Sequence, residues 1–282
     1  MTSATNSPAI IKPEFLRLDG LSIRCATSHR PDAPTLLMLS PWPESIFAYL
    51  PTWDALAADF SLVAVDLPGF GQSQGRPELM SPRAMGDFVV RFAAELGLDH
   101  PHALGPDVGT AALLCAAAYH PGAFASIVVG AGAATFPLHT EGLLKTFVEA
   151  PSLEPFKALD PAEVIRGSVA QIKNYAVPDL ARDDYIASYT GTRFAESIAY
   201  VRRYPADLQA LAPLLTSLTT PVQIIAGLDD PYALDEDAGI LHSQLLHSQL
   251  DLLEAGHCAW EEAPEQYAAI TSRWLTGAFR KV

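Results

Sequence analysis

Short apolar runs alternate with segments of helical periodicity along most of the chain. The runs are nearly continuous in apolar residues, which is typical of strands buried on both faces of a sheet. They lie at residues 35–39, 61–65, 126–129, 222–226 and 250–253. Helical segments separate them, and this alternation predicts a mostly parallel sheet flanked by helices. Residues 15–25, with Asp19-Gly20 at their centre, predict a hairpin that adds an antiparallel edge.

Several helices can be placed from their first residues and their apolar spacing. Ser81-Pro82 supplies a capping residue and a proline at the first helical position, and apolar residues then recur at four-residue spacing. Residues 111–119 are rich in Ala and Leu, and Pro264 begins a last helix. The sequence repeat Leu-His-Ser-Gln-Leu at 241–250 is expected to be a helix end that runs into a strand.

One long segment departs from the alternation. Residues 133–213 have helical periodicity and no convincing strand. The segment holds five of the nine tyrosines, namely Tyr175, Tyr185, Tyr189, Tyr200 and Tyr204. A helical insertion between two strands predicts a lid over the carboxyl ends of the strands, where α/β sheets bind their ligands. We therefore expect a core of residues 1–132 and 214–282 with a helical cap at 133–213.

The strongest chemical motif is Gly105-Pro106-Asp107-Val108-Gly109, between a strand and the Ala-rich helix. A small residue stands two positions before and two after Asp107, as a tight strand-to-helix turn that presents a nucleophile requires. The helix that follows points its first N–H groups at the site, where negative charge develops. Asp107 stands where an esterase has serine, and the alternative is that it only caps the helix.

Two further segments follow the last two strands. Gly256-His257 comes after the last strand, where a histidine can activate water. Asp229-Asp230-Pro231 follows the strand before it, and one of these carboxylates can orient His257. Alone, the histidine segment is as compatible with an ordinary loop as with catalysis, and an Asp-Asp-Pro segment is more often only a turn. Their order along the chain, nucleophile, acid and histidine, is that of the α/β-hydrolases and favours a catalytic triad.

The chain resembles the α/β-hydrolases that use an aspartate nucleophile, the epoxide hydrolases and haloalkane dehalogenases, over residues 15–279. Residues 66–73 are similar to the family's D-x-x-G-x-G-x-S turn, and 42–45 to the end of its H-G-x-P-E-S oxyanion loop. Residues 256–265 match its histidine loop. The resemblance implies Asp230, not Asp229, as the acid. It also implies that the backbone N–H groups of Trp42 and Val108 form the oxyanion hole.

An aspartate nucleophile restricts the reaction. It is ionised at neutral pH and can displace a leaving group from an sp³ carbon, which leaves an alkyl ester on the enzyme. His257 then activates water, which attacks the ester. Carboxylate attack on an ordinary ester would give an anhydride. The expected substrate is therefore a small apolar epoxide or haloalkane, with water as the second reactant.

The leaving group distinguishes these two activities. The resemblance implies lid tyrosines as acids for an epoxide, with Tyr200 or Tyr204 as candidates here. A halide instead needs N–H donors, usually a tryptophan directly after the nucleophile, where this chain has Val108. We therefore expect an epoxide hydrolase. Ser40-Pro41 replaces the family's His-Gly, and the early lid has no tyrosine. The alternatives are a haloalkane dehalogenase and a catalytically inactive binding protein.

Composition and charge narrow the partners. The 282 residues carry a formal charge of −14, which disfavours nucleic acid and anionic membranes as partners. The three cysteines suggest no disulfide framework, and neither a metal-ligand spacing nor a nucleotide-binding loop occurs, so no metal or cofactor is expected. Residues 1–13 have no apolar core that could act as a secretion signal, and a cytoplasmic protein is expected. The oligomeric state stays open.

Overall fold

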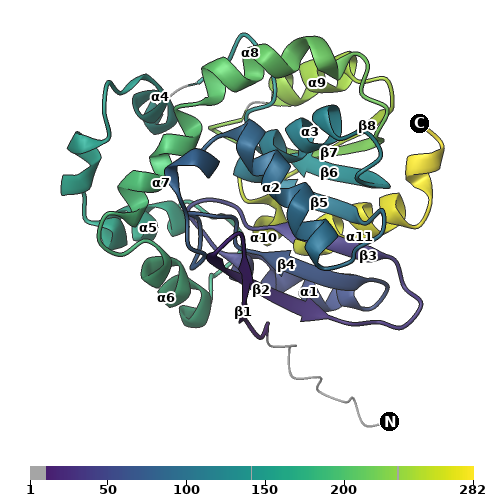
Figure 1. Cartoon of the computed structure of the whole chain (residues 1–282), viewed down its shortest axis with the longest axis horizontal. Coiled ribbons are helices and arrows are strands. Elements are labelled where there is room, and N and C mark those ends of the chain that lie inside the picture. The colour runs from purple at the N-terminus through teal and green to yellow at the C-terminus, as the bar shows by residue number, and fades with distance from the viewer. Residues whose placement is uncertain (1–10, 141, 234) are drawn as a thin grey trace.

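The computed structural model describes residues 11–140, 142–233 and 235–282, which build one eight-stranded sheet with helices on both faces (Figure 1). The strands are β1 (Glu14–Leu18), β2 (Leu21–Ser28), β3 (Thr35–Leu39), β4 (Ser61–Val65), β5 (His102–Pro106), β6 (Ser126–Gly130), β7 (Val222–Gly227) and β8 (Ser248–Leu253). Their order is β1-β2-β4-β3-β5-β6-β7-β8. β2 runs antiparallel to both neighbours and every other pair is parallel, which confirms the predicted fold class.

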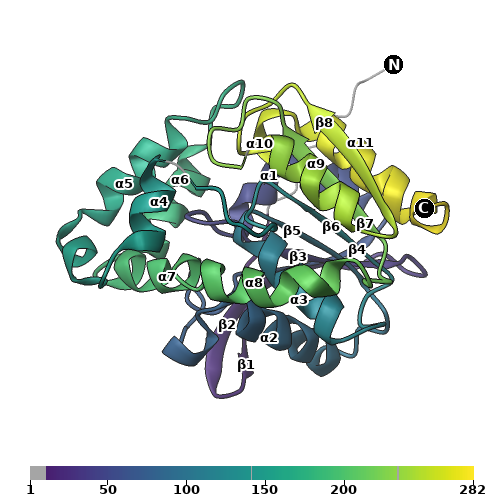
Figure 2. The ribbon, with the colours of Figure 1, turned by 90° about the horizontal axis from the view of Figure 1, so that it is seen from above.

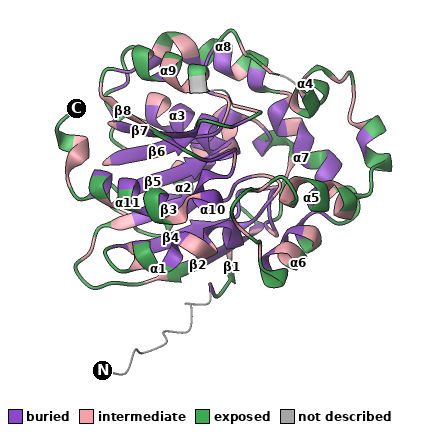
Figure 3. Ribbon diagram, turned by 180° about the vertical axis from the view of Figure 1, so that it is seen from behind, coloured by how far each residue is buried: buried purple, intermediate pink, exposed green. Residues whose placement is uncertain are grey.

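The predicted strands differ from the observed ones mainly at their ends. β3 and β4 have the predicted bounds, β6 and β7 each extend by one glycine, and β8 begins two residues earlier than expected. The expectation that all five are buried on both faces is wrong for β8. It is the outermost strand with a single neighbour, and Leu252 is 42% exposed. The other strands of this group form the buried centre of the molecule (Figure 3).

Helices cover both faces of the sheet (Figure 2). One face carries α2 (Pro82–Glu95) and α3 (Val108–Tyr119), with α8 (Tyr204–Leu215) beside them. The same face carries α9 (Asp235–Gln244), whereas the other carries α1 (Leu50–Ala57) and α11 (Pro264–Leu275). The predicted cap of α2 is present, because Ser81 Oγ accepts the Ala84 N–H at 3.2 Å. α2 and α3 approach closely at Gly86, where a Cβ would lie 2.8 Å from the Ala112 carbonyl oxygen.

The described residues between β6 and β7 form no strand. They contain α4 (Gly142–Glu149), α5 (Pro161–Val169), α6 (Asp179–Ser188) and α7 (Arg193–Val201), followed by α8. The division expected between residues 213 and 214 lies inside α8, so this helix continues from the helical segment onto the face of the sheet that carries α3.

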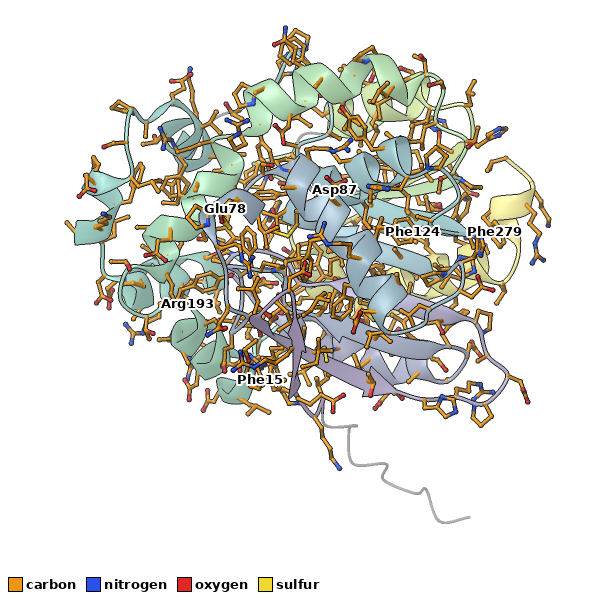
Figure 4. All side chains as sticks on the ribbon, in the orientation of Figure 1. Phe15, Glu78, Asp87, Phe124, Arg193 and Phe279 are labelled. Atoms are coloured by element: carbon orange, nitrogen blue, oxygen red, sulfur yellow. The ribbon has the colours of Figure 1, made fainter. Side chains whose placement is uncertain are left out.

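Two arginines fasten the helical segment to the sheet. Arg24 on β2 is 1% exposed and forms a bidentate pair with Asp184 of α6, with N–O distances of 2.7 and 3.1 Å. Arg193, labelled in Figure 4, donates to the carbonyls of Gly71 and Ser73 in the loop after β4, at 2.7 and 3.0 Å. Such charge-assisted bonds hold the helices in a fixed position above the sheet.

Membrane spans are absent from the helices of the described residues, since none is long and apolar enough to cross a bilayer. The expectation about a secretion signal concerns residues 1–13, of which 1–10 lie outside the described part of the chain.

Candidate active site

Asp107 occupies the sharp turn between β5 and α3. Its φ of 53° and ψ of −121° lie in a region that non-glycine residues rarely adopt, as a strained nucleophile turn requires. The turn needs glycines around it. A Cβ on Gly105 would lie 2.8 Å from Leu113 Cδ1, and one on Gly132 would lie 2.1 Å from the Asp107 carbonyl oxygen. The carboxylate of Asp107 is thereby held at the carboxyl end of the central strands.

Two backbone N–H groups bond to this carboxylate. The Trp42 N–H donates to Asp107 Oδ2 at 2.5 Å, and the Val108 N–H also bonds to the carboxylate. The Ser40-Pro41 departure leaves the Trp42 donor in place, since Ser40 is anchored by bonds to Val65 and Leu67. Both implied oxyanion donors are therefore brought to Asp107.

The other oxygen of the carboxylate faces His257. The distance from His257 Nε2 to Asp107 Oδ1 is 3.8 Å. On the far side of the ring, His257 Nδ1 lies 2.9 Å from Asp230 Oδ2 and 3.1 Å from Oδ1. Asp229 instead points outward, with a side chain 70% exposed and paired with Lys173 at 3.4 Å. The structure thus brings Asp107, His257 and Asp230 together and leaves Asp229 apart.

The charges of the three side chains depend on one another. Burial raises the pKa of Asp107 to about 6, although His257 and the Trp42 and Val108 N–H groups act in the opposite direction. Burial alone lowers the pKa of His257, but the charge and hydrogen bond of Asp230, with the charge of Asp107, outweigh burial and raise it to about 9. Burial opposes ionisation of Asp230 as well, yet His257 and two backbone donors lower its pKa. At neutral pH the resting triad therefore holds an imidazolium between two carboxylates.

A cavity of about 350 Å³ opens above the triad, between the sheet and the helical segment. Asp107 and His257 line it, and most of its remaining wall is apolar. The largest apolar side chains in the wall are Trp42, Leu138, Leu143, Leu144, Phe147 and Phe194. No described residue of the lining is a lysine or arginine, whereas the acidic Glu163 and Asp237 stand in its wall. The cavity therefore suits a small neutral apolar molecule.

The two candidate tyrosines lie in different surroundings. Tyr204 lines the cavity, and its hydroxyl has no hydrogen-bond partner among the described residues. Tyr200 does not line it. The Tyr200 hydroxyl is buried and donates to the Val108 carbonyl oxygen at 2.8 Å, so it supports the nucleophile turn from below. Of the two candidate proton donors, Tyr204 therefore lies at the cavity and Tyr200 lies away from it.

The indole N–H of Trp42 is also engaged. It donates to Ser197 Oγ of α7 at 2.8 Å, and the indole stacks on Phe194 with ring centroids 5.5 Å apart. This N–H is therefore not available as a halide donor in the cavity.

Tyr232 is a cavity residue that the sequence patterns did not reveal. Its backbone N–H donates to Asp230 Oδ1 at 2.8 Å and its ring packs edge-on against His257, with centroids 5.1 Å apart. Its hydroxyl donates to Gln171 of the helical segment at 2.5 Å. Tyr232 thus ties the acid loop to the helices above. The only feature of the sequence that could have indicated Tyr232 as a cavity residue is its position two residues after Asp230.

The fold agrees with the comparisons to known proteins. The family model for the alpha/beta hydrolase fold matches residues 34–264. The chain therefore belongs to the α/β-hydrolase fold family.

Two solved structures illustrate the likeness. Epoxide Hydrolase A from Mycobacterium thermoresistibile superposes with a TM-score of 0.77 at 18% identity, over 95% of this chain and 99% of that one. The haloalkane dehalogenase DbeA from Bradyrhizobium elkani superposes with a TM-score of 0.79 at 20% identity, over 95% of this chain and 98% of that one. At such identities the likeness establishes the shared fold alone.

A curated relative is similar over a shorter stretch. The dihydrolipoyllysine-residue acetyltransferase component of the acetoin cleaving system of Cupriavidus necator is 30% identical over 173 residues, which are 60% of this chain. The match covers 44% of that relative, so the chain spans less than half of its length.

Proposed function

We propose that the protein is an epoxide hydrolase that opens a small, neutral, apolar epoxide to a diol through an ester on Asp107, with residues 133–213 acting as the lid over the substrate. The observation that carries the proposal is the state of the Asp107 carboxylate. Two backbone N–H groups bond to the carboxylate, that of Trp42 at Oδ2, and Oδ1 faces His257 in an apolar cavity. A carboxylate so placed is suited to attack an sp³ carbon and to have its ester hydrolysed afterwards.

In the first step, an Asp107 oxygen bonds to one epoxide carbon while the carbon–oxygen bond of the ring breaks. The alkoxide formed takes a proton from the Tyr204 hydroxyl. Burial raises the pKa of Tyr204, which keeps this hydroxyl protonated until the alkoxide develops. The product is a hydroxyalkyl ester of Asp107, and the proton lost by Tyr204 is restored from solvent.

In the second step, His257 Nε2 accepts a proton from water as the water oxygen attacks the Asp107 carboxyl carbon. Esterification helps this step, because the negative charge of Asp107 is one of the causes that raise the pKa of His257. Once Asp107 is an uncharged ester, His257 gives up its proton more readily and can serve as the base. The Trp42 and Val108 N–H groups stabilise the oxyanion, which collapses to release the diol and restore Asp107.

Comparison of neutral epoxides with haloalkanes of matched size tests the assignment. Diol formation without halide release supports it, whereas halide release with no epoxide turnover assigns the protein to the dehalogenases. The engaged indole N–H of Trp42 and the aliphatic Val108 favour the first result. Binding without any turnover would favour an inactive binding protein.

Tyr204→Phe is expected to lower the rate of ester formation from an epoxide by about 10²-fold or more, since the alkoxide then lacks its proton donor. Single-turnover consumption of the epoxide measures this rate. Tyr119→Phe is the matched control, because Tyr119 lies at the far end of α3 and does not line the cavity. Equal rates in Tyr204→Phe and the wild type would remove Tyr204 from the mechanism.

Ester formation should also fall in acid. Only the ionised carboxylate attacks, so the single-turnover rate should drop about tenfold per pH unit below the Asp107 pKa of about 6. A rate that stays constant down to the ordinary pKa of an aspartate would contradict the buried environment described for this group.

A further inference from the structure

Two buried carboxyl groups lie beside the triad and take no part in the proposed steps. Glu44 stands in the oxyanion loop and is 4% exposed, and Glu261 stands in α10 (Ala259–Glu262) and is 1% exposed. Ligand atoms of the two glutamates and of Cys258 all lie within 4.8 Å of one another. Among the described residues, neither glutamate forms an ion pair with a lysine or arginine.

The hydrogen bonds of the pair are incomplete. Trp260 Nε1 donates to Glu44 Oε2 at 3.2 Å, and the Cys258 thiol lies 3.6 Å from Glu44 Oε1. The Tyr185 hydroxyl donates to Glu261 Oε1 at 3.2 Å. Glu261 Oε2 is buried without any donor. An unpaired buried acceptor is costly, and two adjacent carboxylates cannot both stay ionised in such a site.

We propose that Glu44 and Glu261 hold one proton between them, so that the pair carries a single negative charge next to Asp107 and His257. The shared proton supplies the donor that the unpartnered oxygen of Glu261 lacks. Burial acts in the same direction, since it raises the pKa of Glu44 to about 7, with Asp107 adding to the effect, and that of Glu261 well above its usual value. The titratable groups that face the pair are Tyr49, Asp107, Tyr175, Tyr185, His257, Cys258 and Glu262.

Under the proposed function, the charge of the Glu44–Glu261 pair affects how readily His257 acts as a base. Glu44 is among the groups whose charge raises the pKa of His257. A second negative charge here would keep His257 protonated longer and oppose its role as a base. Glu44 and Glu261 are therefore positioning residues, which set the charge around the triad without touching the substrate.

A metal ion in place of the proton is the alternative. Two donors, Trp260 N–H and Tyr185 O–H, point at the carboxylates and would face a cation unfavourably. Burial also raises the pKa of the Cys258 thiol, which disfavours the thiolate that a metal requires. Both features favour the shared proton.

Infrared spectroscopy of the full chain with carbon-13-labelled glutamate tests the proposal, because a protonated carboxyl group has its own stretching band. At about pH 8, where free glutamates are ionised, the wild type should show this band and Glu261→Gln should lose it. Glu265→Gln is the control, since Glu265 is exposed nearby on α11 and its loss should leave the band unchanged.

Absence of the band from the wild type, its full persistence in Glu261→Gln, or one metal ion per chain in the purified protein would each overturn the proposal. If Glu261→Gln does not fold, Glu44→Gln removes the other member of the pair and should weaken the band. A protein that opens no epoxide would still show the band, so failure of the proposed function and failure of this proposal are distinguishable.

Discussion

Asp107→Asn should lower epoxide turnover by a factor on the order of 10⁴ or more, as loss of a nucleophile does in other triad enzymes. The uncharged amide cannot displace the epoxide oxygen, although it keeps the shape of the carboxylate. Initial rates of diol formation at saturating epoxide measure the effect. Asp229→Asn makes the same substitution on an exposed carboxylate away from the triad and should retain wild-type turnover.

Asp107→Asn should also be more stable than the wild type at neutral pH. Burial raises the pKa of Asp107 from 3.8 to about 6, which corresponds to about 3 kcal/mol of unfavourable free energy for the ionised form. The folded state therefore binds this proton more tightly, and its contribution to stability is present below pH 3.8 and is lost as the pH rises through about 6. Denaturant unfolding should give a higher midpoint for Asp107→Asn at neutral pH and similar midpoints in acid. A less stable variant would instead indicate that Asp107 only caps α3.

His257→Gln should form the ester but hydrolyse it slowly. The first step needs Asp107 and Tyr204, whereas the second needs a base for water, and loss of that base costs about 10²–10⁴-fold. Mixing the variant with excess epoxide should consume one equivalent per chain and then stop. The experiment belongs at about pH 8, because loss of the imidazolium raises the pKa of Asp107 further.

Two results would contradict this account of His257. Continued turnover at the wild-type rate would mean that another group activates the water. Failure to consume even one equivalent, with active wild type, would mean that His257 acts before the ester forms.

The fold was predictable because its signals are local. Strands such as β3 and β4 are buried on both faces, so their apolar runs have sharp ends in the sequence. The turn at Asp107 was predictable for the same reason, since its glycines stand at fixed spacings on either side. β8 was misjudged because an apolar run does not reveal whether a strand has one neighbour or two.

Features that depend on distant contacts were not predictable. Tyr200 and Tyr204 are both apolar-facing residues four positions apart, and only the packing of α7 and α8 decides which one reaches the cavity. The indole of Trp42 bonds a serine 155 residues away, and Trp260 bonds Glu44 across 216 residues. No local pattern encodes such pairs, so the occupied indole and the Glu44–Glu261 pair emerged only from the three-dimensional arrangement.

The central claim, covalent attack by Asp107, is tested most directly by the intact mass of His257→Gln after incubation with a neutral apolar epoxide. The account predicts a mass gain equal to the whole epoxide, located by peptide mapping on the segment that contains Asp107 and missing from the double variant Asp107→Asn/His257→Gln. An unchanged mass in His257→Gln, while the wild type converts the same epoxide to a diol, would contradict the account.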